Sequence, residues 1–297
     1  MSIRLEMLQV ARLAPNILGD SVELVSEFIR SQFNDDGGVA SRSGVSDLYY
    51  TVFGLDCLNA IQEPIDKDRL KSYLKNFGHG EGLDFVHLCC LTHCWSVMED
   101  ESFYTSELCE KIFNELRKYR SDDGGFHPIP NSKCGTAYAG FLGFSAHKNL
   151  RQELRDPLNL VRSLKFLECE SGGWANERGI SLGATNSSAA AVTLLRNLNV
   201  PINQDVSEFF LSHFHQQGGF LAMEFAPMPD LLSTATALHA LTGIQYDVKP
   251  ISEKCLDFID SLWTNKGSFH GNWADDHLDC EYTFYGLLSL GHLSIYT

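Results

Sequence analysis

Apolar positions recur along this chain with the spacing of amphipathic helices, and a glycine-rich turn interrupts the pattern at regular intervals. Six such turns follow one another about 43 to 49 residues apart, centred on Gly37-Gly38, Gly80-x-Gly82, Gly124-Gly125, Gly172-Gly173, Gly218-Gly219 and Gly267-Ser268. A fixed period of this length indicates one helix-turn-helix unit repeated along the chain. We therefore expect an all-α fold in which residues 1–297 form a single domain, an (α/α)6 barrel of six helical hairpins.

The two helices of each unit differ in polarity. The helix before a turn is amphipathic, and two such helices start with an acid followed three residues later by glutamate, at Asp20 and Asp205, which resembles a capping box. The helix after a turn is rich in small and apolar residues on all sides, as in 187–193. Because such a helix is buried on both faces, we place the second helices in an inner ring. Aspartates at aligned positions predict N-caps for three of them: Asp47, Asp230 and Asp279.

Composition limits the partners. The net charge is −15, from 23 basic and 38 acidic residues, which argues against nucleic acid and against an anionic membrane surface. We expect no membrane insertion, because no apolar run approaches the roughly 18 residues that a spanning helix needs. The N-terminus shows no secretory signal, so we expect a cytoplasmic protein whose nine cysteines are reduced and mostly buried.

A motif that follows the glycine turn carries a family resemblance. The pattern Asp-x-x-aromatic-Thr-x-aromatic-Gly occurs in residues 47–54 and again in 279–286. It resembles the β-subunits of protein prenyltransferases and the related squalene and terpene cyclases. The resemblance extends through the repeats over essentially the whole chain. It implies an isoprenoid diphosphate substrate and a helical partner subunit, and it implies the fold more firmly than the reaction, because one fold hosts several chemistries.

The resemblance also bears on zinc. The protein prenyltransferases hold a catalytic zinc through an Asp-x-Cys pair and a histidine, which lowers the pKa of the acceptor cysteine. The matching positions here are Asp230, Leu232 and Tyr282, so two of the three ligands are replaced. We therefore do not expect zinc, and we expect an acceptor other than a protein cysteine.

The densest polar cluster lies just before the last inner helix. Asp275, Asp276 and Asp279 spell D-D-x-x-D, a cluster that in isoprenoid chemistry holds Mg²⁺ and helps a diphosphate to leave. These three aspartates are our candidate metal ligands, with Mg²⁺ as the predicted cofactor. The alternative interpretation is structural: Asp279 is a helix cap, and the other two are loop acids.

Basic and aromatic residues complete the candidate site. Arg42, Lys133 and Arg178 each follow a glycine turn on the rim where inner helices begin, and the resemblance implies diphosphate binding there, helped by helix N-termini. Each is otherwise a solvated loop charge. Aromatic residues at the same level can face the barrel interior and stabilise a carbocation by cation–π attraction: Tyr49, Tyr50, Phe53, Tyr138, Trp174, Tyr282 and Tyr285.

Within that set, Tyr50 and Tyr282 occupy matched positions and are our catalytic candidates, with Glu281 or His277 as the proton acceptor. The sequence thus favours an isoprenoid-diphosphate-processing enzyme, a terpene cyclase or a non-zinc prenyltransferase-like protein that ionises a prenyl diphosphate in an aromatic cavity. Two alternatives stay open. One is a non-catalytic subunit that binds prenyl groups or lipids. The other is a glycoside hydrolase on the same kind of barrel, using carboxylates such as Asp276, Asp279 and Glu281.

Overall fold

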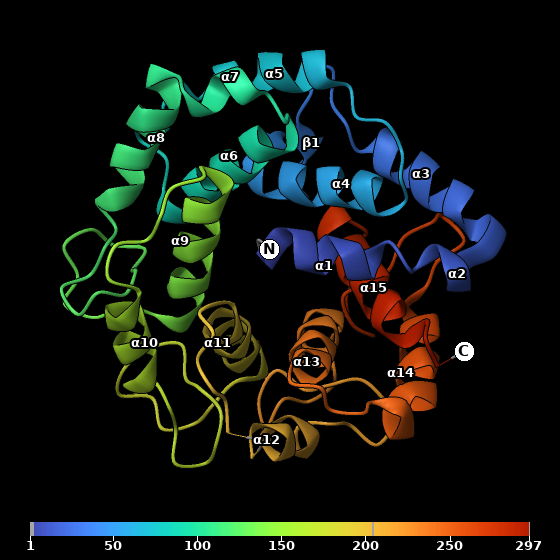
Figure 1. The fold of residues 1–297 in the computed structure, drawn as a ribbon. Coiled ribbons are helices and arrows are strands. Elements are labelled where there is room, and N and C mark those ends of the chain that lie inside the picture. Colours follow the sequence, from blue (N-terminus) through green and yellow to red (C-terminus); the bar gives the residue numbers. More distant parts are fainter. Residues whose placement is uncertain (1–2, 204, 297) are drawn as a thin grey trace.

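The computed structural model describes residues 3–203 and 205–296 of the chain. Helices alternate between two concentric rings (Figure 1). The inner ring consists of α4 (Leu48–Ala60), α6 (Phe85–Val97), α9 (Ala137–Asn149), α11 (Thr185–Asn197), α13 (Leu231–Gly243) and α15 (Cys280–Leu293). The outer ring consists of α3 (Val22–Ser31), α5 (Lys67–Lys75), α8 (Glu107–Arg117), α10 (Pro157–Lys165), α12 (Val206–Ser212) and α14 (Lys249–Leu262). The expected (α/α)6 barrel is therefore confirmed.

Shorter elements join the rings. They are α2 (Pro15–Leu18), the 3-10 turn η1 (Gly19–Ser21), α7 (Glu101–Tyr104), and an antiparallel pair of two-residue strands, β1 (Val39–Ala40) and β2 (Ser46–Asp47). In that pair Val39 lies opposite Asp47, which fixes the loop that leads into α4. Within the described residues, no helix has both the length and the apolar character needed to cross a bilayer.

Burial follows the polarity of the sequence. Residues 187–195 of α11 are all buried, because this helix contacts neighbours on both sides and a second helix ring behind it. The outer helix α8 buries only one side, at Cys109, Ile112 and Leu116, and exposes charged residues on the other. The predicted assignment of inner and outer helices is thus correct. All nine cysteines are free thiols and most are buried.

The predicted caps are confirmed for the inner ring. Asp47, Asp230 and Asp279 each stand in extended backbone at the N-cap and accept a backbone N–H of the first turn at 2.7–2.9 Å. The capping boxes predicted for the outer ring are wrong. Asp20 lies inside η1, and Asp205 has helical backbone angles, so neither carboxylate can swing back onto the helix N-terminus.

The glycine turns close the ring. The first glycine of each turn has a φ between +82° and +94°, which residues with a Cβ adopt only with strain. Each of the last two turns also contacts the outer helix of the next hairpin. A Cβ on Gly218 would collide with the carbonyl oxygen of Lys254 on α14, and one on Gly267 would collide with that of Leu24 on α3. The sixth turn therefore packs against the first hairpin.

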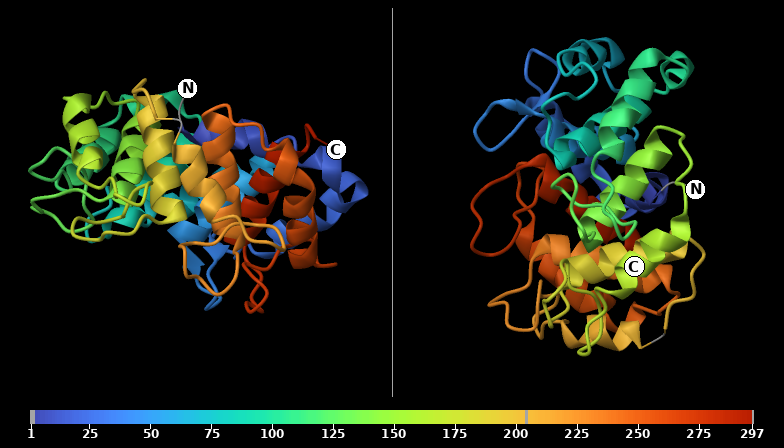
Figure 2. Two further views of the ribbon diagram at one scale, coloured as in Figure 1. Left: turned by 90° about the horizontal axis from the view of Figure 1, so that it is seen from below. Right: turned by 90° about the vertical axis from the view of Figure 1, so that its left-hand side faces the viewer.

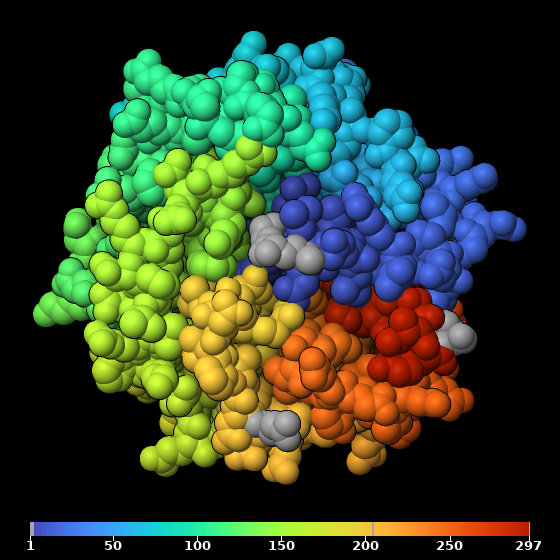
Figure 3. Space-filling model, viewed as in Figure 1, coloured from blue at the N-terminus to red at the C-terminus, as the bar shows by residue number. Residues whose placement is uncertain are grey.

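The two ends of the barrel are different. The inner helices all begin at one end, and the loops that lead into them project there, on one side of the ring (Figure 2). We call this end the rim, and define its loops as 41–46, 126–135, 175–184, 221–229 and 271–278. Helix α1 (Ile3–Ala11) lies across the opposite end, where it covers the centre of the ring (Figures 1 and 3). We call that end the closed end.

Candidate functional site

A cavity of about 340 Å³ lies inside the inner ring between the rim and α1. Apolar and aromatic side chains dominate its wall, with a few amide, hydroxyl and imidazole groups among them. The residues that line it are Met7, Tyr49, Tyr138, Phe141, Asn186, Ala189, Ala190, Thr193, Leu232, Thr236, His239 and Tyr285. A concave, mostly apolar site with a few polar groups is the usual form of a small-molecule site.

The cavity wall follows a simple rule of helix phase. The second residue of an inner helix faces inward in four hairpins: Tyr49, Tyr138, Asn186 and Leu232. Further lining residues follow at helical spacing, such as Thr193 on α11 and His239 on α13, each seven residues beyond the second position of its helix. Tyr138, in the first turn of α9 next to the rim, is 43% exposed.

Opposite sides of the cavity differ in character. Aromatic rings from α4, α9 and α15 form one side, and Phe53 supports it from behind, with its ring centroid 5.0 Å from that of Tyr49 and 5.5 Å from that of Tyr285. Small residues of α11, Ala189 and Ala190, form much of the other side and leave the space open. The predicted aromatic wall is therefore present, and Tyr49, Tyr138 and Tyr285 are its cavity-lining members.

A carboxyl group lies beside this aromatic wall. Glu281 is the second residue of α15, and its Oε1 accepts a hydrogen bond of 2.6 Å from the hydroxyl of Tyr49. Burial raises the pKa of the Glu281 carboxyl, although the bond from Tyr49 works against that rise. Burial also raises the pKa of the Tyr49 phenol, so Tyr49 remains the donor. Glu281 is thus a half-buried acid–base group next to an apolar cavity.

On the rim, one arginine joins the first loop to the last. Arg42 donates from Nε to Asp279 Oδ2 at 2.9 Å and from Nη2 to Asp275 Oδ2 at 3.0 Å. Its guanidinium carbon also lies 5.7 Å from the ring centroid of Tyr282. Burial disfavours the charge of Arg42, but the bond to Asp279, then that to Asp275, raises the arginine pKa above its ordinary value. We call Arg42, Asp275 and Asp279 the rim clamp.

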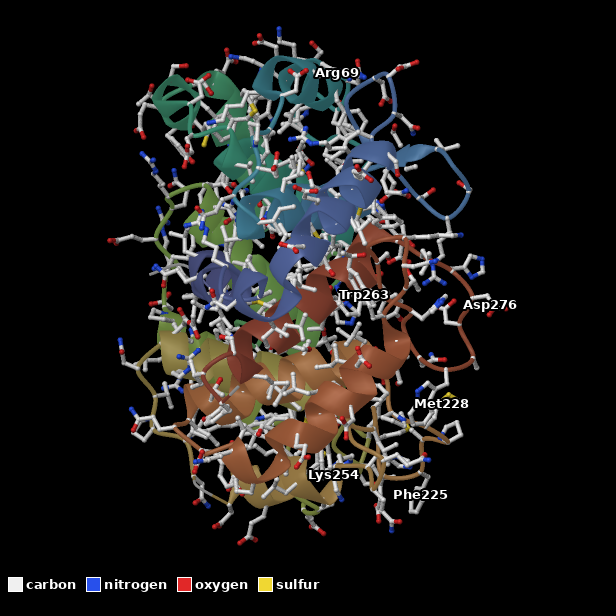
Figure 4. All side chains as sticks on the ribbon, turned by 90° about the vertical axis from the view of Figure 1, so that its right-hand side faces the viewer. Arg69, Phe225, Met228, Lys254, Trp263 and Asp276 are labelled. Carbon is white, nitrogen blue, oxygen red and sulfur yellow. The ribbon has the colours of Figure 1, made fainter. Side chains whose placement is uncertain are left out.

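The rim clamp bears on the predicted metal site. Asp275 and Asp279 face a guanidinium, whereas Asp276 is exposed on its loop (Figure 4). Among the residues that the structure describes, no three His, Cys, Asp or Glu side chains gather in a way that could hold a metal ion. A guanidinium between two of the carboxylates opposes a second cation. As these side chains lie, they do not fit Mg²⁺, and Mg²⁺ stays a prediction that this arrangement does not support.

The remaining predicted residues lie apart from the cavity. Arg178 pairs with Asp123 at 3.0 Å and covers the ring of Phe166, and Lys133 is exposed. His277 is exposed and contacts Asp275 at 3.1 Å. The structure therefore does not bring Lys133 and Arg178 to Arg42, and their role in diphosphate binding stays a prediction.

The two predicted catalytic tyrosines lie on the rim. Neither Tyr50 nor Tyr282 is among the described residues that line the cavity. Both are the third residue of their helix, one step beyond the inward-facing position, and both lie near Arg42. Their catalytic role stays a prediction. The sequence reasoning did not find Met7 or His239; the repeat register could have pointed to His239, whereas α1 lies outside the repeats and gives no such signal.

Comparisons with known proteins agree with this architecture. The family model of the prenyltransferase alpha-alpha toroid domain matches residues 16–79 and 185–295. Among solved structures, Candida albicans protein geranylgeranyltransferase-I complexed with GGPP is similar, with 13% identity and a TM-score of 0.72, over 91% of this chain and 90% of that chain. A search among curated proteins finds no match.

Two further structures have the same fold. One is a variant of the type II terpene cyclase MstE from Scytonema, in complex with geranylgeranyl dihydroxybenzoate. It is 12% identical and has a TM-score of 0.61, and the match covers 95% of this chain and 98% of that chain. The other is a polysaccharide lyase with 10% identity and a TM-score of 0.57, over 97% and 98%. At these identities the likeness shows the fold alone.

Proposed function

Because the chain belongs to the prenyltransferase alpha-alpha toroid family, whose model matches more than half of its residues, we propose that it is an enzyme that transforms an isoprenoid chain inside its barrel. The observation that carries this proposal is the central cavity, about 340 Å³ in volume and lined mainly by apolar and aromatic side chains. Transfer of hydrocarbon from water to such a site is favourable by about 25 cal/mol per Å² of apolar surface. A branched hydrocarbon chain is thus a better match for this cavity than a sugar.

The aromatic side of the cavity also suits a carbocation. The faces of tyrosine and phenylalanine rings attract positive charge, and Tyr49, Tyr138, Phe141 and Tyr285 surround one side of the space. An allylic cation formed from a prenyl diphosphate, when the C–O bond breaks and the diphosphate leaves with the electron pair, would lie against these rings. Water is largely excluded from such a site, which protects the cation from capture by solvent.

Glu281 is the group that we propose to end the reaction. Its carboxylate accepts a proton from the carbon next to the cationic centre, and the C–H electron pair becomes the new double bond. Tyr49, which lines the cavity, holds Oε1 by its 2.6 Å hydrogen bond and so fixes the carboxylate beside the cavity wall. The proposal that Arg42, Lys133 and Arg178 bind the diphosphate rests on the family resemblance alone. In this structure two carboxylates already balance the charge of Arg42.

One observation favours a second candidate, a barrel that binds an isoprenoid without reacting it. The rim clamp neutralises Arg42, so ionisation of a diphosphate receives little help from this side chain as it lies. A glycoside hydrolase receives less support. Two of its candidate carboxylates lie in different surroundings. Asp276 is exposed to solvent, whereas Asp279 caps α15 and is paired with Arg42.

The test is incubation of the protein with geranyl, farnesyl and geranylgeranyl diphosphate, with Mg²⁺ and with EDTA, followed by measurement of pyrophosphate and of organic products. Pyrophosphate release with a hydrocarbon or alcohol product supports the enzyme, and loss of release in EDTA supports a metal requirement. Binding of the prenyl chain without release, measured by calorimetry, supports the binding protein instead. If no prenyl compound binds or reacts, the proposal fails.

A further inference from the structure

Helix α1 closes the barrel although it belongs to none of the six hairpins. Ile3, Leu8 and Ala11 are buried against the ends of the inner helices. The backbone of α1 also approaches α15 closely, because a Cβ on Gly291 would collide with the carbonyl oxygen of Val10. Glycine at this position therefore permits the close approach, and α1 lies firmly against the closed end.

Ion pairs fix α1 from two sides. Arg4 Nε donates to Asp56 Oδ1 on α4 at 3.3 Å, and His93 on α6 contacts the same carboxyl group at 3.0 Å. Glu6 accepts hydrogen bonds from Arg196 and from Asn197, both on α11, the latter at 3.3 Å. Because these anchors lie on two different inner helices, α4 and α11, α1 can neither slide nor rotate without breaking one of them.

Met7 follows directly after the Glu6 anchor and is the α1 side chain that lines the cavity. Its neighbours in the cavity wall include Thr193 and His239, which lie in the second half of α11 and α13 and so toward the closed end. Met7 also packs against the buried apolar core. The floor of the cavity is thus formed by a flexible thioether side chain, carried by an anchored helix, and not by the repeated hairpins alone.

We propose that Met7 sets the depth of the cavity and thereby the length of the isoprenoid chain that the barrel accepts. The inference rests on the proposed function, because it requires a prenyl chain that enters at the rim and extends toward α1. An isoprene unit contains five carbons, and each methylene buried in an apolar site changes affinity about fourfold. Truncation of Met7 to alanine removes three heavy atoms and makes room for most of one further unit. A bulkier residue at this position removes room.

The experiment compares Met7→Ala, Met7→Trp and the wild-type protein in their affinity for geraniol, farnesol and geranylgeraniol, measured by calorimetry. We expect the affinity for geranylgeraniol relative to farnesol to rise by about tenfold in Met7→Ala, and to fall by a similar factor in Met7→Trp. Leu5→Ala is the matched control, since Leu5 lies on the same helix and is 44% exposed. Its ratio should equal that of the wild type. Thermal unfolding confirms that each variant is folded.

The outcomes separate this inference from the proposed function. If the wild-type protein binds none of the three alcohols, both the proposed function and this inference fail. If it binds them but both Met7 variants keep the wild-type ratio within about twofold, Met7 does not set the depth and the proposed function stands. A shift in the same direction in both variants also overturns the inference, because general loosening of the closed end would produce it. Opposite shifts support it.

Discussion

The two ends of the barrel use the same kind of ion pair in different surroundings. At the closed end, the side chains of Arg4 and Asp56 are 14% and 8% exposed. On the rim, the side chain of Arg42 is 35% exposed and that of its partner Asp279 is 4% exposed. Because about a third of the Arg42 side chain meets water, its ion pairs are less constrained than the pair that is buried on both sides. The comparison indicates a rigid floor and a mouth whose charges remain open to rearrangement.

The titratable groups near the cavity differ in the same sense. Glu281 lies near the rim, and burial raises the pKa of its carboxyl above the ordinary value. His239 lies toward the closed end, where burial and then the charge of Arg196 lower the imidazole pKa to about 3. His239 is therefore neutral at ordinary pH and adds no charge to the floor. We thus assign proton transfer to the rim end of the cavity and selection of chain length to its closed end.

The largest expected effect tests the chemistry assigned to the mouth. Replacement Glu281→Gln keeps the shape of the side chain but removes the proton acceptor. We expect formation of the deprotonated hydrocarbon product to fall by about a hundredfold or more, because general acid–base groups contribute at least that much. Affinity for farnesol should stay within about twofold, since Glu281 is not part of the hydrocarbon wall. Analysis of the organic products and calorimetry measure the two quantities.

The control for this variant is Glu224→Gln, which changes an exposed carboxylate on a rim loop. Its yield of this product should equal that of the wild type. An equal yield in Glu281→Gln and Glu224→Gln would contradict the assignment of Glu281 and would move the proton acceptor elsewhere.

The second effect is on the stability of the closed end. In Asp56→Asn the buried carboxylate that faces Arg4 and His93 is lost, and a charge remains without its partner. We expect a loss of about 3 kcal/mol in the free energy of unfolding, measured with urea at neutral pH. Burial works to raise the Asp56 pKa, but His93, then Arg4, outweighs it and holds the pKa below the ordinary value.

The pH dependence of this difference follows from that sign. A depressed carboxyl pKa stabilises the fold above the unfolded pKa, and this contribution is lost as the pH falls through the folded pKa. Wild type and Asp56→Asn should therefore converge in stability on acidification. A constant difference at all pH values would mean that shape, and not charge, causes the loss.

The third effect is the matching change on the rim. In Asp279→Asn the pair with Arg42 is lost, but asparagine remains a good N-cap for α15. Because Arg42 stays partly solvated and keeps Asp275, we expect a loss of about 1 kcal/mol. Urea unfolding should thus rank Asp56→Asn well above Asp279→Asn, with the exposed Asp276→Asn near zero. The reverse order would contradict the contrast between a rigid floor and an adaptable mouth.

How much of this could be predicted from the sequence depends on repetition. The glycine turns recur six times, and aspartate caps recur at three aligned inner helices, so their roles follow from local chemistry: a positive φ at the first glycine, and an oxygen that accepts an N–H bond. Which face of each inner helix points into the cavity was harder to predict, and the prediction was off by one residue. Tyr49 and Tyr50 look alike in the sequence, and only the direction of the helix decides which of them faces the cavity.

Contacts between distant segments could not be predicted from the sequence. Arg42 was predicted to bind an anion from a ligand, and it contacts carboxylates that lie 233 and 237 residues further along the chain. No local pattern records such a pairing. Helix α1 is a stronger case, because it has no counterpart in the other repeats, and Met7 lies at the cavity on a helix that apolar packing and the ion pairs of Arg4 and Glu6 hold in place.

The smallest expected effect is the pH dependence that Glu281 adds at the mouth. Since burial raises its pKa, the folded state binds the proton more tightly than the unfolded chain does. The stabilisation by this group is therefore present at low pH and is lost as the pH rises through the raised pKa. We expect wild type to lose stability relative to Glu281→Gln over that interval, and product formation by the wild type to rise over the same interval as the acceptor ionises. Urea unfolding and the yield of deprotonated hydrocarbon product across the same pH series measure both. If product formation rises while the stability difference stays flat, a group other than Glu281 controls the reaction, and the mouth is adaptable without being the site of proton transfer.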